Sequence, residues 1–217
     1  MYNFTMRMLR LFFGLFLYAL GIVVTMNANI GFAPWEVFHK GISNISGFTI
    51  GQTSIIVGFL ICILVLLMGE KLGLGTLFNM LIIGVFIDII MFLDFIPHMK
   101  SFYFGVPMLF LGLLIIATAS FFYISSGFGA GPRDSLMVAI EKKTGFSSGL
   151  SKGIIEATAV LAGWFLGGPV GLGTLIAAFG IGLCIDIVFK LFDFSPSEIK
   201  HETFAKTFSR ILKYNNR

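Results

Sequence analysis

The chain has 217 residues, of which 57% are apolar and only 12% are charged, and its mean hydropathy is +0.95. Soluble domains carry about 25% charged residues, so this composition excludes a water-soluble globular protein and indicates an integral membrane protein. The two cysteines lie within apolar segments, which excludes a secreted disulfide scaffold.

Six apolar segments are long enough to span the roughly 30 Å of hydrocarbon in a bilayer. They are Leu9–Met26, Ile50–Met68, Leu74–Phe95, Phe104–Ile124, Leu150–Leu166 and Leu172–Phe192. The first segment follows two arginines, as the apolar part of a signal peptide does. Its copy in the second half of the chain is internal and cannot be cleaved, so we interpret the first segment as a permanent membrane helix.

A shorter, less apolar stretch separates the first and second spans of each half and carries a glycine, a proline and an acid at one spacing. These residues are Gly31, Pro34 and Glu36, then Gly129, Pro132 and Asp134. Proline and an acid both suit the first turn of a helix, which predicts short helices over Pro34–Ser43 and Pro132–Lys143. They either lie on opposite membrane surfaces or enter the membrane with their N-termini near its midplane.

The two halves of the chain carry the same motifs in the same order. The run Gly73–Leu77 returns letter for letter as Gly171–Leu175, and Asp88 returns as Asp186. The offset is 98 in both cases (171 − 73 and 186 − 88). The sequence therefore predicts two copies of one membrane unit, residues 1–98 and 99–196, followed by a tail, residues 197–217.

Three spans per copy reverse the direction in which the second copy enters the membrane. The predicted fold is all-α and polytopic: six transmembrane helices in two inverted three-helix repeats, each with a short extra helix between its first and second spans, plus a C-terminal amphipathic helix. Inverted repeats recur in transporters, whose substrate sites lie where the halves meet. A duplication retained only as a scaffold also fits.

Basic residues predict the orientation, because cytoplasmic loops are enriched in lysine and arginine. With the N-terminus inside, the outer side holds only Lys40 and Lys100. The inner side holds Arg7, Arg10, Lys71, Arg133, Lys142, Lys143, Lys152, Lys190, Lys200, Lys206, Arg210, Lys213 and Arg217. Both termini are therefore predicted to be cytoplasmic, and the tail to lie as an amphipathic helix on the anionic inner leaflet.

Charged residues inside spans are the first candidates for a functional site, because an aspartate there costs about 2.5–3.5 kcal/mol. Asp88 and Asp186 are repeat mates; Lys190 lies one turn after Asp186, and Lys40 is a partner on the same side as Asp88. The favoured interpretation is a structural lock that ties each third helix to its short helix. Substrate or proton binding is the alternative.

Positions that differ between the two copies form a second set of candidate site residues. A protein that handles one route or one ligand tends to diversify its repeated positions where that route or ligand is contacted. Glu156 and Lys152 correspond to Gly58 and Ser54, Arg133 corresponds to Trp35, and Asn79 corresponds to Ala177. A simple ion pair between Lys152 and Glu156 near the inner interface is equally consistent with their spacing. The candidate substrate-binding residues are Pro34, Trp35, Glu36, Asn79, Asp88, Arg133, Asp134, Lys152, Glu156 and Asp186.

No catalytic or metal-binding arrangement is visible in the sequence. The three histidines are scattered, as we interpret them, among loops and the tail, and there is no phosphate-binding loop. We expect no enzyme activity, no cofactor and no bound metal. The positive charge is explained by topology, so nucleic acid is not an expected partner.

Three motif runs resemble the bacterial YczE/YyaS/YitT group of membrane proteins, and the YczE-like branch most of all. They are Gly31–Val37, Gly47–Gln52 and Gly73–Asn79. The resemblance covers nearly the whole chain apart from the tail. It implies a multi-pass protein of the bacterial inner membrane with a poorly defined activity, and it supplies neither a substrate nor site residues.

The leading functional hypothesis is a small-solute transporter or channel with a polar site between its two halves. Beyond lipid and solute, a second copy or a partner protein is a further expected contact. The alternative is a membrane scaffold, or a substrate-binding subunit that does not transport by itself. Transport requires a polar cavity that touches both acid motifs, whereas scaffolding predicts a dry core.

Overall fold

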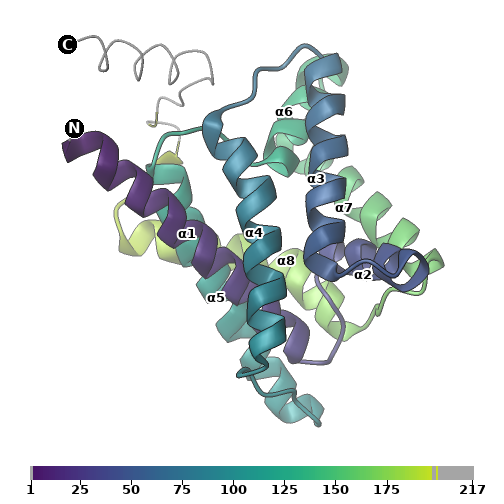
Figure 1. Cartoon of the computed structure of the whole chain (residues 1–217). Helices are drawn as coiled ribbons and strands as arrows, with labels where there is room; N and C mark the ends of the chain where they lie inside the picture. Colours follow the sequence, from purple (N-terminus) through teal and green to yellow (C-terminus); the bar gives the residue numbers. More distant parts are fainter. Residues whose placement is uncertain (1, 197–198, 200–217) are drawn as a thin grey trace.

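The structure is a computed structural model that describes residues 2–196 and residue 199. This part of the chain folds into eight α-helices and contains no strand (Figure 1). The helices are α1 (Tyr2–Asn27), α2 (Pro34–Ser46), α3 (Ile50–Leu67), α4 (Leu74–Leu93), α5 (Phe102–Ser125), α6 (Pro132–Thr144), α7 (Ser148–Phe165) and α8 (Leu172–Leu191). The predicted tail helix lies outside the described residues.

Five helices, α1, α3, α4, α5 and α8, are long and apolar enough to cross a membrane. The sixth predicted span, α7, has the same 18-residue length as α3 but does not meet the same hydropathy requirement within the described residues. The reason is visible in its sequence, because Lys152 and Glu156 both lie in its first half.

Local sequence explains where the helices begin and end. Thr49 starts α3 with a capping box, in which its hydroxyl accepts the Gln52 N–H and the Gln52 side chain accepts the Thr49 N–H. The two short helices begin at prolines, as predicted, and end where Gly47 and Gly145 adopt left-handed φ values of 76° and 74°. They run slightly further than predicted, to Ser46 and Thr144.

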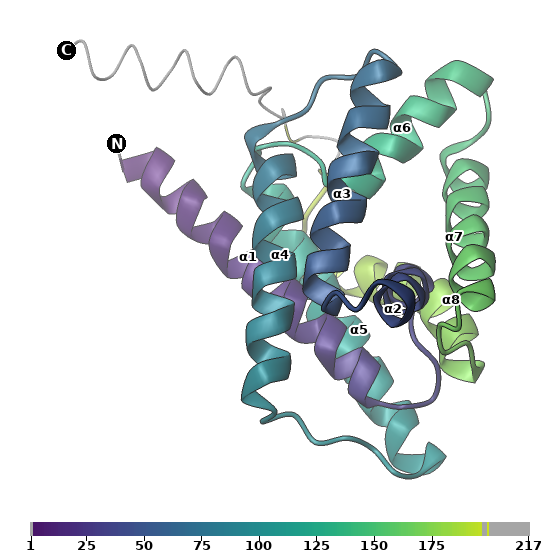
Figure 2. The same ribbon diagram turned by 45° about the vertical axis from the view of Figure 1, so that its right-hand side comes forward.

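The helices form two groups of four. In the crossed group, α1 packs against α5 and α4, and α5 packs against α8. In the hairpin group, α2 and α3 form one helical hairpin, α6 and α7 form another, and each short helix packs on the second helix of the other hairpin. The two groups are joined mainly where α3 packs along α4, whereas α7 stands apart from α4 at the opposite side (Figure 2).

The two halves of the chain interlock at two equivalent junctions. The Gly75 N–H donates to the Phe128 carbonyl at 2.8 Å, and the Gly173 N–H donates to the Ile30 carbonyl at 2.7 Å. Each bond joins the start of a third span to the loop before the short helix of the other half. The repeated Gly-Leu-Gly-Thr motif supplies the close approach that these junctions need.

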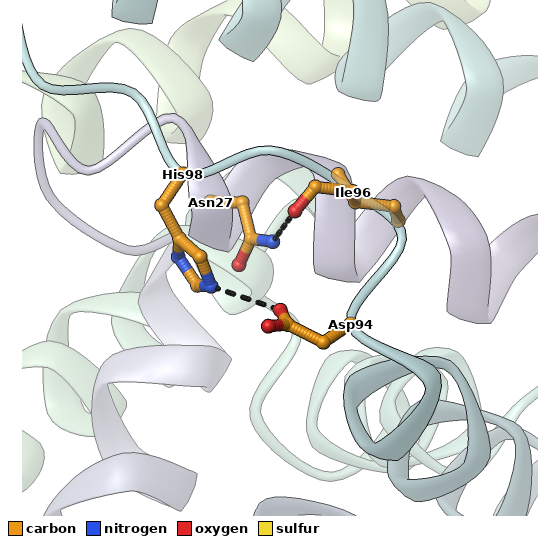
Figure 3. Close-up of polar contacts among 4 residues, drawn as sticks. All are labelled: Asn27, Asp94, Ile96 and His98. Atoms are coloured by element: carbon orange, nitrogen blue, oxygen red, sulfur yellow. Dashed lines mark hydrogen bonds and ion pairs between the residues drawn. The ribbon is translucent and has the colours of Figure 1, made fainter.

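The ends of α1 are tied to neighbouring turns. At one end, the Asn27 amide donates to the Ile96 carbonyl at 2.9 Å, beside the His98–Asp94 contact of 3.4 Å (Figure 3). At the other end, Arg7 Nε donates to the Ser126 carbonyl at 2.7 Å. The side chain of Ile199, near the last helix, lies by the same turn, so both ends of the described chain meet at one end of the molecule.

Candidate functional site

A cavity of about 240 Å³ lies between the crossed group and the hairpin group, and all eight described helices contribute to its lining. This volume is slightly below the roughly 300–1,000 Å³ of typical small-molecule sites. Eight of the ten candidate residues line it: Pro34, Trp35, Glu36, Asn79, Arg133, Asp134, Lys152 and Glu156. The cavity is therefore the place where the sequence-based candidates converge.

The starts of α2 and α6 meet inside this cavity. The guanidinium carbon of Arg133 lies 4.7 Å from the centre of the Trp35 ring, in cation–π geometry. Arg133 Nη2 also lies 3.6 Å from Glu36 Oε1. Both short helices therefore begin at the lining of one cavity inside the molecule.

Ionised side chains in the lining are arranged as pairs. The Glu36 side chain is only 6% exposed, so the neighbouring Arg133 compensates a carboxylate that has lost most of its water. Lys152 Nζ and Glu156 Oε1 lie 3.9 Å apart, which is the pair that their spacing predicts. With Asp134, the lining carries three carboxylates and two cationic groups.

Several lining residues were missed by the sequence-based reasoning. His39 was grouped with scattered histidines although the predicted short helix Pro34–Ser43 contains it, and it is buried in α2 at 2% exposure. Tyr18 and Tyr123 enter the cavity from α1 and α5, inside segments that were predicted only from their apolar character. The signal that was overlooked is a hydroxyl well inside an apolar span, and a histidine one helical turn after Glu36.

Two buried polar atoms in this lining have no hydrogen-bond partner among the described residues: His39 Nδ1 and the Tyr123 hydroxyl oxygen. Leaving a buried polar group unpaired costs about 1–3 kcal/mol, so such groups in a cavity indicate a place for solute or water. In the described residues, no three potential metal ligands lie together.

Asp88 and Asp186 lie outside the cavity lining. Asp88 accepts hydrogen bonds from the Thr49 hydroxyl at 2.6 Å and the Gly51 N–H at 2.9 Å. It thus ties α4 to the start of α3, a lock between two spans, not between the third span and the short helix. Asp186 is exposed and makes no such bond among the described residues, with Lys190 or any other group.

Residues 5–190 match the model of a family described as a family of unknown function, DUF6198. The chain belongs to this family. It is 40% identical over 177 residues to the uncharacterized membrane protein YczE of Bacillus subtilis (strain 168). This alignment covers 80% of the chain and 81% of that protein. The resemblance to the YczE and YyaS proteins is thereby confirmed.

Two further relatives are more distant. An uncharacterized protein of Haemophilus influenzae is 30% identical over 172 residues, with coverage of 79% of the chain and 78% of that protein. The uncharacterized protein YyaS of Bacillus subtilis is 25% identical over 166 residues, with coverage of 75% and 82%. No solved structure matches the chain. The family is thus one of membrane proteins whose names state no activity.

Proposed function

We propose that this protein is a carrier that binds a small polar solute in the cavity between its two helix groups and moves it across the bacterial cytoplasmic membrane. In this proposal the chain has six spans in two inverted repeats, with both termini in the cytoplasm. The observation that carries it is the cavity whose lining includes both repeat-related acid motifs, Glu36 and Asp134. A scaffold would require no such cavity.

The proposed role of α7 as the sixth span rests on where its charges point. Lys152 and Glu156 both line the cavity, and charged side chains in membrane spans are tolerated when they face a polar interior and pair. Their position explains why α7 is less apolar than α3, whose corresponding residues are Ser54 and Gly58.

The lining favours a solute that carries both a positive and a negative group. Three carboxylates and two cationic side chains line the cavity, so a zwitterionic solute finds an oppositely charged side chain for each of its groups. Trp35 and His39 add aromatic surface, their ring centres 6.3 Å apart. With a cavity of about 240 Å³, the solute is small.

The test is ligand-induced stabilisation of the purified protein. Panels of small organic cations, zwitterions and organic anions are added in turn, and the midpoint of thermal unfolding is measured. A solute at 100 times its Kd stabilises the folded state by about 2.7 kcal/mol. We expect members of the zwitterion panel to raise the midpoint, and the best of them to be taken up by proteoliposomes that contain the protein.

Variants locate the effect. Glu156→Gln removes a charge from the cavity and is expected to abolish both stabilisation and uptake without loss of expression. Glu70→Gln is the matched control. Glu70 also pairs with a lysine, Lys142, at a distance of 2.8 Å, but neither residue belongs to the cavity lining. If no panel member stabilises the protein, or if Glu156→Gln responds as the unaltered chain does, the proposed site is wrong.

A further inference from the structure

A long helix of the hairpin group packs along a helix of the crossed group in only one of the two halves of the described chain. Helix α3 packs along α4, but α7 and α8, which occupy the corresponding positions of the second half, do not pack along each other. The other helix pairings have an equivalent in the second half. The packing of α1 on α4 corresponds to that of α5 on α8, and the packing of α2 on α7 corresponds to that of α6 on α3. The missing α7–α8 contact is therefore a departure from an otherwise repeated pattern.

Two pairs of equivalent glycines show the same difference. Gly51 and Gly84 are buried where α3 crosses α4, and each approaches the backbone oxygen of the other so closely that a Cβ would not fit. Gly149 and Gly182 occupy the equivalent positions, 98 residues later (149 − 51 and 182 − 84). Both are exposed, and a Cβ on either would meet nothing within 4 Å.

The two equivalent aspartates differ between the halves in the same way as the glycines do. Asp88 holds the start of α3 through the Thr49 hydroxyl and the Gly51 N–H. The equivalent groups of the second half are all present as Asp186, the Ser147 hydroxyl and the Gly149 N–H, but no bond joins them among the described residues. Instead the Ser147 hydroxyl only accepts the Leu150 N–H at 3.3 Å.

The cavity extends toward this unclosed contact. Ile185 and Phe189 of α8 belong to its lining, whereas Ile87 and Met91, their equivalents on α4, do not. The cavity thus extends further along α8, past the position of Asp186, than along α4.

We propose that the protein has a second conformation, in which the start of α7 docks on α8 while the start of α3 leaves α4. Asp186 then accepts the Ser147 hydroxyl and the Gly149 N–H, and Gly149 packs against Gly182. This proposal rests on the proposed carrier function: the hairpin group rocks against the crossed group and opens the cavity to each side of the membrane in turn.

The physical reason is that each aspartate has one conformation in which it is satisfied. An unpaired aspartate in a span is destabilising. In each conformation one of the two aspartates is unpaired and the other accepts its hydrogen bonds. Two nearly equivalent clamps keep the two states close in free energy, which is the condition for exchange between them. The exposed glycines of the second half provide a contact surface that only the second conformation uses.

The experiment measures distances between spin labels at two matched pairs of positions. Native Cys62 and Cys184 are first replaced by alanine. One label pair is Phe146→Cys with Leu191→Cys, at the start of α7 and the end of α8; the other is Phe48→Cys with Leu93→Cys, 98 residues earlier. All four positions are exposed, so labels are tolerated. We expect a long and a short distance in each pair.

Substitutions at the clamps should move the two populations in opposite directions. Asp88→Asn, and independently Thr49→Ala, weaken the clamp present in this structure. The population with the short α7–α8 distance should therefore increase roughly tenfold relative to the population with the long distance. Asp186→Asn should remove most of the population with the short distance. Gly182→Leu should remove it entirely, although its side chain has free space here.

The outcomes separate this proposal from the proposed function. A single α7–α8 distance that stays unchanged in Asp88→Asn, Thr49→Ala and Gly182→Leu overturns the second conformation, even if a solute binds. Reciprocal shifts in the two label pairs support it, even if no solute in the panels binds. Because the labels report geometry alone, neither result depends on knowing the solute.

Discussion

Arg133 has two contacts in the cavity that no other cation in the lining has. It stacks over Trp35 at 4.7 Å and lies 3.6 Å from the carboxylate of Glu36, which is almost fully buried. A buried carboxylate without a partner is destabilising, and breaking a fully buried pair costs about 3–5 kcal/mol. The arginine is 30% exposed, so its removal should cost less than that.

We therefore expect Arg133→Ala to lower the free energy of unfolding by about 2 kcal/mol, mainly because Glu36 loses its counter-charge. The double variant Arg133→Ala with Glu36→Gln should recover part of this loss. Arg133→Lys should remain intermediate, since lysine keeps the charge but not the planar stacking. Unfolding in detergent by heat measures all three, and equal losses in the single and double variants would contradict the pairing.

At the scale of elements, the junctions between halves depend on backbone that only glycine accommodates. Gly31 has a φ of 114°, and a Cβ on it would lie 2.6 Å from the Gly171 nitrogen. Gly129 has a φ of 120° and approaches Gly73 in the same way. These positions hold the two halves together and also set the direction in which each short helix enters the cavity.

Gly31→Ala should lower the free energy of unfolding by about 3 kcal/mol or more, because left-handed backbone costs about 1–2 kcal/mol and the added methyl also overlaps Gly171. Gly47→Ala is the matched control. Its φ is 76°, but a Cβ there meets nothing within 4 Å, so it should cost only about 1 kcal/mol. Similar losses in the two variants would mean that the junction contributes little.

Sequence patterns predicted the helices well because their causes are local. Pro34 and Pro132 mark the observed starts of the short helices, and five of the six predicted spans are helices long and apolar enough to cross a membrane. The partners of Asp88 were not predictable, because a hydrogen bond to the first turn of another helix leaves no spacing signature. The burial of His39 also depends on tertiary packing that the pattern of α2 alone does not specify.

The site was predicted in outline for a related reason. Motifs repeated at one offset, and charges that break the repeat, both identified residues of one cavity, since a site between two halves uses equivalent positions from each. The predicted Asp186–Lys190 pair is absent among the described residues. Its spacing permits a contact, but the exposed surface of a helix gives such a pair little stability.

At the scale of the whole molecule, the orientation in the membrane is the main expectation to test. Lys100 and Lys143 are both exposed, in the loop before α5 and near the end of α6. The distribution of basic residues predicts that they lie on opposite sides of the membrane. In a background without native cysteines, Lys100→Cys should react with a membrane-impermeant thiol reagent in intact cells, and Lys143→Cys only after permeabilisation.

Labelling of both cysteines from the same side would contradict the six-span arrangement, and reversal of the two would contradict the orientation alone. A cysteine at Arg10, near the start of the chain, should behave as Lys143→Cys does, because both ends of the described chain lie at one end of the molecule. These three positions therefore test the orientation of the chain from α1 to α6 without any knowledge of the solute.

The stacking of Arg133 on Trp35 has a consequence for the history of the gene. The two positions are equivalent in the two halves, so in an ancestral dimer of identical subunits each would have faced its own copy. Two arginines would repel there, and a cation over an aromatic ring needs two different residues. The contact was thus accessible only after the two copies had become distinct sequences, in which the sister positions were free to mutate independently.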